Sequence, residues 1–334
     1  MTLHLGILGI DHGHIFGMLS NMQREGCTAT HWWTDGPAVT EAKFSETFPD
    51  LIKTEKDRIL EDPSIDMVLI SAIPSDRAAL AIKAMKAGKD VMVDKPGCTT
   101  LEQLADIRKT HVETGRIWSV NFSERFEVPS VTKASQLVQQ GAIGRVIQTV
   151  NLAPHKQNLK TRPDWYFKRE KFGGILTDIG SHQIDQFLHF TGSTDVEITQ
   201  ALVENTTRPE HPEFQDYGEV TLRGDKGHGY VRLDWFTPDG LPTWGDGRLF
   251  ILGTEGTIEC RKYTDIGQPH RTNILYLVNG TQNEQIDCAD EPLPYFPDLI
   301  NDVRNRTETA NPQEQTFLTM ELAIKAQMKA EADA

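Results

Sequence analysis

Short hydrophobic runs alternate with amphipathic segments through the first third of the chain. Each run is a few residues long and suits a buried strand, and the segments between them have helical spacing. The predicted strands are Leu3–Leu8, Thr28–Trp33, Met67–Ala72, Val91–Val93 and Ile117–Val120. Because strands alternate with helices, the pattern predicts an α/β fold with a parallel sheet and right-handed crossovers.

The pattern changes after Asn121. A helix is expected near Val128–Gln140, and strand-like runs joined by short turns then dominate. These runs are Val146–Leu152, Val196–Val203, Gly218–Leu222, Gly229–Trp235, Leu249–Leu252, Thr257–Arg261 and Ile274–Val278. They predict a large, open, mostly antiparallel sheet packed on helices. We therefore expect a first domain at residues 1–122 and an α/β second domain at residues 123–334.

Two further segments of the second half stand out. The spacing at Gln313–Ala332 predicts a structural helix, with buried positions Phe317, Met320, Leu322, Ile324 and Met328. The segment 236–248 is rich in turn residues and apolar for a hairpin tip, so we interpret it as a lid or a subunit contact.

The segment 173–192 carries the most informative polar pattern. At about 100° per residue its apolar side chains share one side of a helix, and Asp178, His182, Asp185 and His189 share the other. Gly173 and Gly174 precede the helix, and Gly192 is placed to cap its end. The polar side could be an ordinary solvated face or, less favoured without a second ligand cluster, a metal site. It could also transfer protons, since a carboxylate one turn before a histidine can fix its tautomer.

Composition narrows the class of partner. The 334 residues carry a formal net charge of −14, which disfavours nucleic acid and acidic membrane surfaces. No apolar run reaches the length of a membrane span. Four scattered cysteines without a CxxC pair, and a beginning that does not read as a signal peptide, favour a reducing cytoplasm. We expect small-molecule partners and no metal.

Ligands of a parallel sheet bind at the carboxyl ends of its strands, which here are four short loops. The expected cofactor-binding residues are Gly9, Ile10, Asp11, His12, Gly13, His14, Asp35, Ala72, Ile73, Pro74, Lys95 and Pro96. The first loop departs from the dinucleotide fingerprint, because Asp11 stands where a second glycine is expected. Asp35 follows the second strand, where an acid can bind a ribose 2′-hydroxyl or simply form a turn. We therefore expect NAD in preference to NADP.

Lys95 stands between an acid and a proline at the end of the strand Val91–Val93. Pro96 biases Lys95 toward an extended backbone, which would direct its side chain to the ligand edge of the sheet. Together, Asp94-Lys95-Pro96 and the segment Gly173 to Asp185 resemble the two motifs of the Gfo/Idh/MocA oxidoreductases. Those motifs are a Glu-Lys-Pro tripeptide after a Rossmann strand and a later Gly-Gly...Asp-x-Gly-x-His-x-x-Asp helix.

The resemblance covers nearly the whole chain and implies an N-terminal Rossmann domain followed by a substrate-binding and oligomerisation domain. It implies catalytic roles for Lys95, Asp178 and His182, which would also contact substrate. Three departures are Asp94 for the usual glutamate, Asp11 in the glycine loop, and Arg77 where a histidine often stands. Other expected substrate-binding residues are Arg125, His155 and Trp165.

The function implied is an NAD(P)-dependent oxidoreductase that transfers hydride between nicotinamide and a secondary alcohol of a sugar, inositol or sugar acid. A homodimer or homotetramer is expected. One alternative within the fold is a glycoside-cleaving enzyme that uses tightly held NAD. The other is a ligand-binding or regulatory relative without turnover, which Asp11 would favour by weakening phosphate binding.

Overall fold

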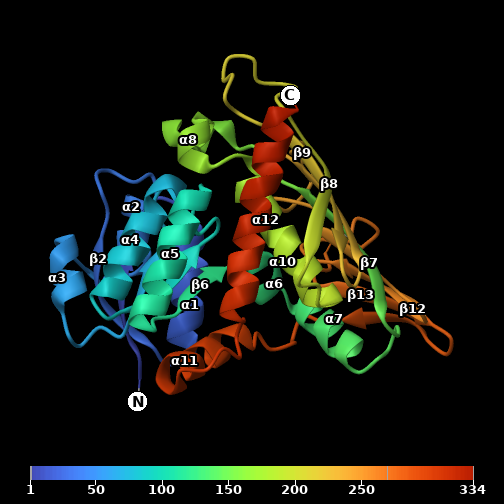
Figure 1. The fold of residues 1–334 in the computed structure, drawn as a ribbon, viewed down its shortest axis with the longest axis horizontal. Coiled ribbons are helices and arrows are strands. Elements are labelled where there is room, and N and C mark those ends of the chain that lie inside the picture. The colour runs from blue at the N-terminus through green and yellow to red at the C-terminus, as the bar shows by residue number, and fades with distance from the viewer. Residues whose placement is uncertain (1, 269, 334) are drawn as a thin grey trace. The chain divides into compact units, whose positions relative to one another are not determined.

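In the computed structural model, which describes residues 2–268 and 270–333, the alternating elements of the first part of the chain form a six-stranded sheet (Figure 1). All neighbouring strands run parallel, in the order β3-β2-β1-β4-β5-β6. This is the order of a doubly wound Rossmann sheet. The predicted α/β fold with a parallel sheet is confirmed.

Five strands of this sheet lie close to the predicted runs, and the short strand β3 was not predicted. The strands are β1 (His4–Leu8), β2 (Thr28–Trp33), β3 (Ile52–Lys53), β4 (Met67–Ile70), β5 (Asp90–Asp94) and β6 (Trp118–Asn121). The helices are α1 (His14–Arg24), α2 (Glu41–Thr47), α3 (Lys56–Glu61), α4 (Pro74–Lys86) and α5 (Leu101–Thr114). β4 and β5 are buried along their whole length, as expected for central strands of a parallel sheet covered on both faces.

The chain divides into two units, each described here by itself. The first unit consists of Met1–Asn121, Pro163–Gly173 and Tyr295–Met320, and the second of Phe122–Arg162, Gly174–Pro294 and Glu321–Ala334. The first unit therefore also holds the 3-10 helix η2 (Asp164–Phe167), α8 (Arg169–Phe172) and α11 (Tyr295–Asn305). The helix α12 (Gln313–Ala332) supplies residues to both units.

The second unit is built on an eight-stranded sheet with the order β14-β13-β12-β11-β7-β10-β9-β8. Its strands are β7 (Val146–Pro154), β8 (Val196–Glu204), β9 (Tyr217–Gly224), β10 (His228–Asp234), β11 (Arg248–Gly253), β12 (Gly256–Arg261), β13 (Ile274–Asn279) and β14 (Asn283–Asp287). Only the pair β7 and β10 is parallel among these neighbours, so the prediction of a mostly antiparallel sheet is confirmed.

The helices of this unit are α6 (Ser123–Phe126), α7 (Pro129–Gln139), α9 (Ile175–Asp178) and α10 (Gly180–Thr191), with a 3-10 helix η1 (Leu159–Thr161). Of these, α7, α9 and α10 pack on the sheet, and α6 packs on α7 and α10. α10 lies on β7 and β10, where a Cβ at Gly229 would come within 2.8 Å of the Phe187 ring. A glycine in β10 therefore lets the helix approach the sheet closely. α7 completes a core cluster with Leu249, Ile251 and Cys260.

Two expectations about elements are corrected, and one strand of the second sheet was missed. The segment 173–192 forms two helices, α9 and α10, and residues 180–188 are all buried, so α10 has no solvated face there. β14 was not predicted, because its sequence is polar. Met328 is 52% exposed rather than buried, since the buried side of α12 continues through Ala326, Gln327 and Ala330.

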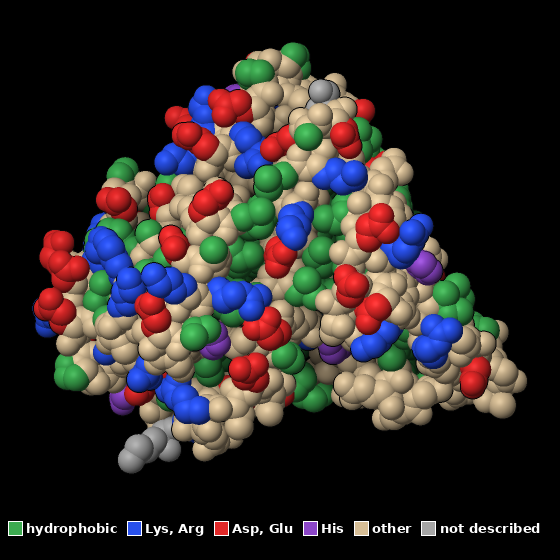
Figure 2. Space-filling model, in the orientation of Figure 1, with side chains coloured by type: hydrophobic (Ala, Val, Ile, Leu, Met, Phe, Trp, Pro, Cys, Tyr) green, Lys and Arg blue, Asp and Glu red, His purple; other side chains and the backbone are tan. Residues whose placement is uncertain are grey.

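The described residues add three facts about surface and compartment. No helix among them is long and apolar enough to cross a membrane. The four cysteines are buried thiols without disulfides. On the face drawn in Figure 2, Lys and Arg side chains are interspersed with Asp and Glu, so neither sign forms a broad patch there.

Candidate functional site

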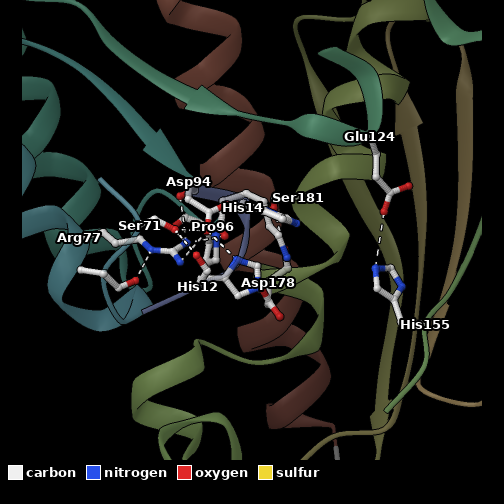
Figure 3. Close-up of polar contacts among 12 residues, drawn as sticks. His12, His14, Ser71, Arg77, Asp94, Pro96, Glu124, His155, Asp178 and Ser181 are labelled. Atoms are coloured by element: carbon white, nitrogen blue, oxygen red, sulfur yellow. Dashed lines mark hydrogen bonds and ion pairs between the residues drawn. The ribbon is translucent and has the colours of Figure 1, made fainter. Parts of the chain in front are cut away.

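Three strand ends of the first unit converge on one carboxylate (Figure 3). Asp94, the last residue of β5, accepts from Nδ1 of His12 and Nδ1 of His14, each at 2.8 Å, and from the Ser71 hydroxyl at 3.1 Å. His12 stands in the loop after β1, His14 is the first residue of α1, and Ser71 follows β4. The backbone amide of His12 also donates to the Ser71 carbonyl oxygen at 3.1 Å. The ligand edge of the sheet is therefore one hydrogen-bonded cluster.

Arg77, on the first turns of α4, is the cation of this cluster. Its Nη2 donates to Asp94 Oδ2 at 2.9 Å, and its side chain is 1% exposed. Its other donors reach backbone carbonyl oxygens of Ala72, Asp94, Lys95 and Pro96. The departure from the family pattern at position 77 is thus a buried anchor of the Lys95 loop.

Burial and charge set the protonation of these groups. The Asp94 carboxylate is fully buried, which alone would raise its pKa, but Arg77 and the two imidazoles hold the pKa well below its usual range. Burial lowers the pKa of His12 to about 4, against the attraction of Asp94. His12 is therefore neutral at pH 7. Because an ionised carboxylate only accepts, the His12 proton sits on Nδ1 and Nε2 is an acceptor.

Asp11 has the opposite shift. Burial raises its pKa from 3.8 to about 6, although Arg77 and the Thr34 hydroxyl, which donates to Asp11 Oδ2 at 3.5 Å, favour the ionised form. The carboxyl in the glycine loop thus retains a proton to a higher pH than an ordinary aspartate. This lessens its repulsion of a phosphate as the pH falls toward 6.

The same cluster is the one group of described residues placed to hold a metal ion, through His12, His14 and Asp94. Both imidazole nitrogens are within hydrogen-bond distance of the carboxylate, and the Arg77 guanidinium lies 2.9 Å from it. A fixed positive charge at that distance opposes a cation. The geometry is that of a hydrogen-bonded cluster.

The start of α1 is open to a ligand. Gly9 has φ +83°, and a Cβ there would lie 2.8 Å or less from Ala72 backbone atoms, so glycine permits the β1 and β4 loops to touch. A Cβ at Gly13, the residue before α1, would meet nothing within 4 Å. The helix α1 has eleven residues, and no atom of a described residue obstructs its N-terminus at Gly13. Such a helix can bind a phosphate through its first backbone amides. Asp35, just after β2, is exposed.

Lys95 follows β5 and is 5% exposed, and the Lys95–Pro96 peptide bond is cis.

A separate cavity of about 600 Å³ lies near the opposite, amino-terminal ends of the strands, beside Leu3, Asp66 and Asp90. Asp90 there is bound by Arg306 at 2.7 and 2.9 Å. This cavity is at the edge of the sheet where nucleotides do not bind.

In the second unit, α9 and α10 bury the predicted acid/base pair. Asp178 is 8% exposed and His182 is 2% exposed. The Ser181 hydroxyl donates to the backbone carbonyl oxygen of Asp178 at 3.0 Å. The side-chain Nε2 of Gln186 donates to the backbone carbonyl oxygen of His182 at 3.1 Å. The His182 ring lies edge-on to Phe122, with centroids 6.4 Å apart. The helix thus holds this imidazole away from bulk water.

The other two residues of the predicted polar side, Asp185 and His189, have protein partners. Asp185 receives Nε and Nη2 of Arg125 at 2.5 and 2.7 Å. His189 contacts the Ser135 hydroxyl at 2.8 Å through Nε2. Burial, then the charge of Arg125, lowers the pKa of His189 well below its usual value. A polar stripe can therefore be buried when α6 and α7 supply partners.

A second charged cluster surrounds Glu124 on α6. Its Oε2 accepts from Lys262 Nζ at 3.0 Å, and its Oε1 lies 3.9 Å from His155 Nε2 (Figure 3). Burial opposes ionisation, but Lys262 and the charges of His182 and His155 lower the pKa of Glu124 to about 2. The His155 ring also contacts Trp235 and Trp244, with centroids 5.1 and 4.5 Å away.

The structure thus brings His12 and His14 together with Asp94 in the first unit, which also contains Trp165 on η2 and Lys95. The second unit contains Asp178, His182, Arg125 and His155. Sequence reasoning did not anticipate Ser71, Glu124 or Lys262 as members of these clusters. The signal available was weak, since a charged residue beside a predicted strand end is usually solvated.

Comparisons with known proteins identify the chain. Residues 33–122 match the model of an oxidoreductase family with an NAD-binding Rossmann fold, and residues 131–259 match the GFO/IDH/MocA C-terminal domain. The chain belongs to the Gfo/Idh/MocA family. The suspected resemblance is therefore confirmed, and the first unit contains the family's NAD-binding Rossmann domain.

A solved structure from Erwinia carotovora atroseptica SCRI1043, named as a candidate oxidoreductase, is 43% identical with a TM-score of 0.95. The match covers 98% of this chain and 99% of that one. Two Bacillus subtilis (strain 168) proteins are more distant in sequence. The scyllo-inositol 2-dehydrogenase (NADP(+)) IolW is 25% identical over 66% of this chain and 60% of its own length. The scyllo-inositol 2-dehydrogenase (NAD(+)) is 29% identical over 60% of this chain and 56% of its own length.

Proposed function

We propose that this protein is an NAD(P)-dependent oxidoreductase that acts on a secondary alcohol of a sugar, an inositol or a sugar acid. The observation that carries the proposal is the match to both family domains, together with Lys95 and the Asp178-His182 pair at the motif positions. The two curated relatives named above are inositol dehydrogenases, one for each nicotinamide cofactor. That supports a polyol as the class of substrate.

The proposed chemistry assigns one task to each residue. His182 takes the proton of the reacting hydroxyl and returns it in the reverse direction, because an imidazole exchanges protons near neutral pH. Lys95 donates a hydrogen bond to the same oxygen, and Asp178 orients the Lys95 and His182 side chains. The hydride would be accepted or supplied by a nicotinamide cofactor bound at the carboxyl ends of the strands of the first unit.

The first unit is suited to a dinucleotide at the carboxyl ends of its strands. The open start of α1 beyond Gly13 can receive the pyrophosphate on backbone amides. Asp35, which is exposed after β2, would accept from a ribose 2′-hydroxyl and would repel a 2′-phosphate. We therefore propose NAD in preference to NADP.

The remaining assignments are proposals of the same kind. Substrate-side roles for Arg125, His155 and Trp165 stay predictions. So do a homodimer or homotetramer, a cytoplasmic location, and the absence of nucleic-acid or membrane partners. The separate charges on the face in Figure 2 and the net charge of −14 support a small-molecule partner.

The test is to incubate the protein with each member of a panel of inositols, sugars and sugar acids in the presence of NAD or NADP. The change in absorbance at 340 nm measures turnover. His182→Asn should lower kcat for the substrate found by about a hundredfold or more, because general acid–base catalysis contributes that much. His228→Asn is the matched control, since His228 is exposed on β10.

Calorimetry with NAD decides whether each variant still binds cofactor. A His182→Asn protein that binds NAD and turns over substrate within about threefold of the wild type contradicts the assignment. A wild-type protein that binds neither dinucleotide contradicts the oxidoreductase proposal as a whole.

A further inference from the structure

We propose that Arg77 is a positioning residue for Lys95: it fixes the backbone from which the lysine side chain extends. The inference rests on the proposed function, in which Lys95 contacts the reacting oxygen. Arg77 itself is fully buried on α4 and is assigned to no contact with substrate or cofactor. It acts through the loop Asp94–Pro96.

The contacts of Arg77 all lead to this loop and its neighbour. Nη1 donates to three consecutive carbonyl oxygens, those of Asp94 at 3.0 Å, Lys95, and Pro96 at 3.1 Å. Nη2 donates to Asp94 Oδ2 at 2.9 Å, and Nε donates to the Ala72 carbonyl oxygen at 2.8 Å. One guanidinium therefore holds the residues before and after Lys95 as well as Lys95 itself.

Only arginine can make this set of contacts. The guanidinium is planar, carries five N–H donors in a fixed fork, and stays charged in every pH range that proteins tolerate. A lysine has one nitrogen with three donors and cannot reach both the Ala72 carbonyl and the three-carbonyl cluster at once. Arg77→Lys therefore keeps the charge and removes the fork.

The anion of the cluster connects this anchor to the cofactor loop. The Asp94 carboxylate that binds Arg77 also accepts from His12 and His14. The Lys95 loop and the loop after β1 thus share one charge-compensated carboxylate. A catalytic side chain is positioned more accurately when its backbone is fixed in this way, and small errors in its position reduce the reaction rate strongly.

The alternative is that Arg77 is only a core residue whose loss loosens the whole unit. Lys89 and Lys95 provide an internal comparison, since they flank β5 and are each 5% exposed. Lys89 is held by the carbonyl oxygens of Asp62 and Ile65 before the start of β5, whereas Arg77 binds Asp94 at the end of that strand. General loosening exposes both lysines, whereas loss of the anchor exposes Lys95.

The experiment is a brief acetic anhydride pulse on the full-length protein, with acetylation at each lysine quantified by mass spectrometry. Arg77→Lys should raise acetylation of Lys95 by about threefold or more and leave Lys89 within about 1.5-fold of the wild type. An unchanged Lys95, or an equal rise at both lysines, overturns the proposal. If Arg77→Lys does not fold, Asp94→Glu is tested in the same way, because it displaces the guanidinium by one methylene and keeps the charge.

Kinetics on the identified substrate give the second readout. Arg77→Lys should lower kcat by about tenfold with a change in KM below about threefold, because Lys95 is misplaced and not removed. An unchanged kcat overturns the proposal. Lys95→Met distinguishes failure of the proposed function from failure of the positioning role of Arg77. If Lys95→Met leaves turnover unaltered, the proposed function of Lys95 is wrong, whatever the labelling shows about Arg77.

Discussion

Individual side chains at the ligand edge of the first sheet titrate unusually because the fold buries them beside charges. Asp94 stays ionised since Arg77 donates to its carboxylate directly at 2.9 Å, whereas for Asp11 burial outweighs the charge of Arg77 and the weak hydrogen bond from Thr34. Two acids of the same loop cluster are thus driven in opposite directions. The proximity of a full positive charge decides between them.

Asp11 predicts a pH dependence of stability. Its folded pKa of about 6 exceeds the ordinary 3.8, so the folded state binds this proton more tightly than the unfolded state. Its contribution to the free energy of unfolding therefore falls as the pH rises from about 4 to about 6 and stays low above that. Asp11→Asn should raise the free energy of unfolding by about 1–3 kcal/mol at pH 8 and leave it unchanged near pH 4. Urea unfolding at both pH values measures this, and an equal gain at both would contradict it.

Lys95 and His182 could be proposed as site residues from sequence because each lies within a short motif of characteristic spacing. The cluster around Asp94 could not, since His12 and Asp94 are 82 positions apart and meet only when the sheet forms. Arg77 looked like a departure from a pattern. Its proposed role depends on backbone carbonyl oxygens. Every residue has one, so the sequence does not show which of them the Arg77 side chain contacts.

At the scale of elements, helical spacing predicted α10 and its Gly192 cap, and the structure confirms both. The solvated-face interpretation failed because a polar stripe has the same spacing whether it meets water or the polar side chains of a neighbouring helix. Arg125 and Ser135 supply those partners. β14 escaped prediction for a related reason: it is a mostly exposed edge strand with one hydrophobic residue, Ile286.

Loss of the buried ion pair between Arg125 on α6 and Asp185 on α10 should lower the free energy of unfolding strongly. Arg125→Met leaves Asp185 buried without its cation, so the free energy of unfolding should fall by about 3–5 kcal/mol. Arg223→Met is the matched control, because Arg223 and Glu197 form a pair that is more than half exposed, and it should cost under about 1 kcal/mol. Chemical denaturation compares the two, and equal losses would contradict the burial argument.

At the scale of the molecule, the sequence predicted two kinds of sheet in the right order. It did not show that the segments 163–173 and 295–320 belong with the first unit. Periodicity reports which face of an element is buried but not against which sheet. α12 shows this most clearly, since Phe317 stacks on Trp118 in the first unit, whereas the Gln327 side chain accepts from the Leu176 amide in the second.

Removal of α12 should therefore destabilise both units. A chain that stops after residue 312 loses the ring stacked on Trp118 and the partner of the Leu176 amide. We expect limited proteolysis to cut it within the first and the second unit at protease concentrations that leave the full chain intact. Fragments that map to one unit alone would show that the other does not depend on α12.

The shared helix also bears on synthesis. A ribosome that has translated the strands of both sheets has not yet supplied the residues that complete either core, because α12 begins at Gln313 and reaches Ala332. Neither unit can finish folding independently while the chain is still attached at an earlier residue. An interrupted chain thus presents two incomplete cores to chaperones and proteases, so one helix makes the survival of both units depend on complete translation.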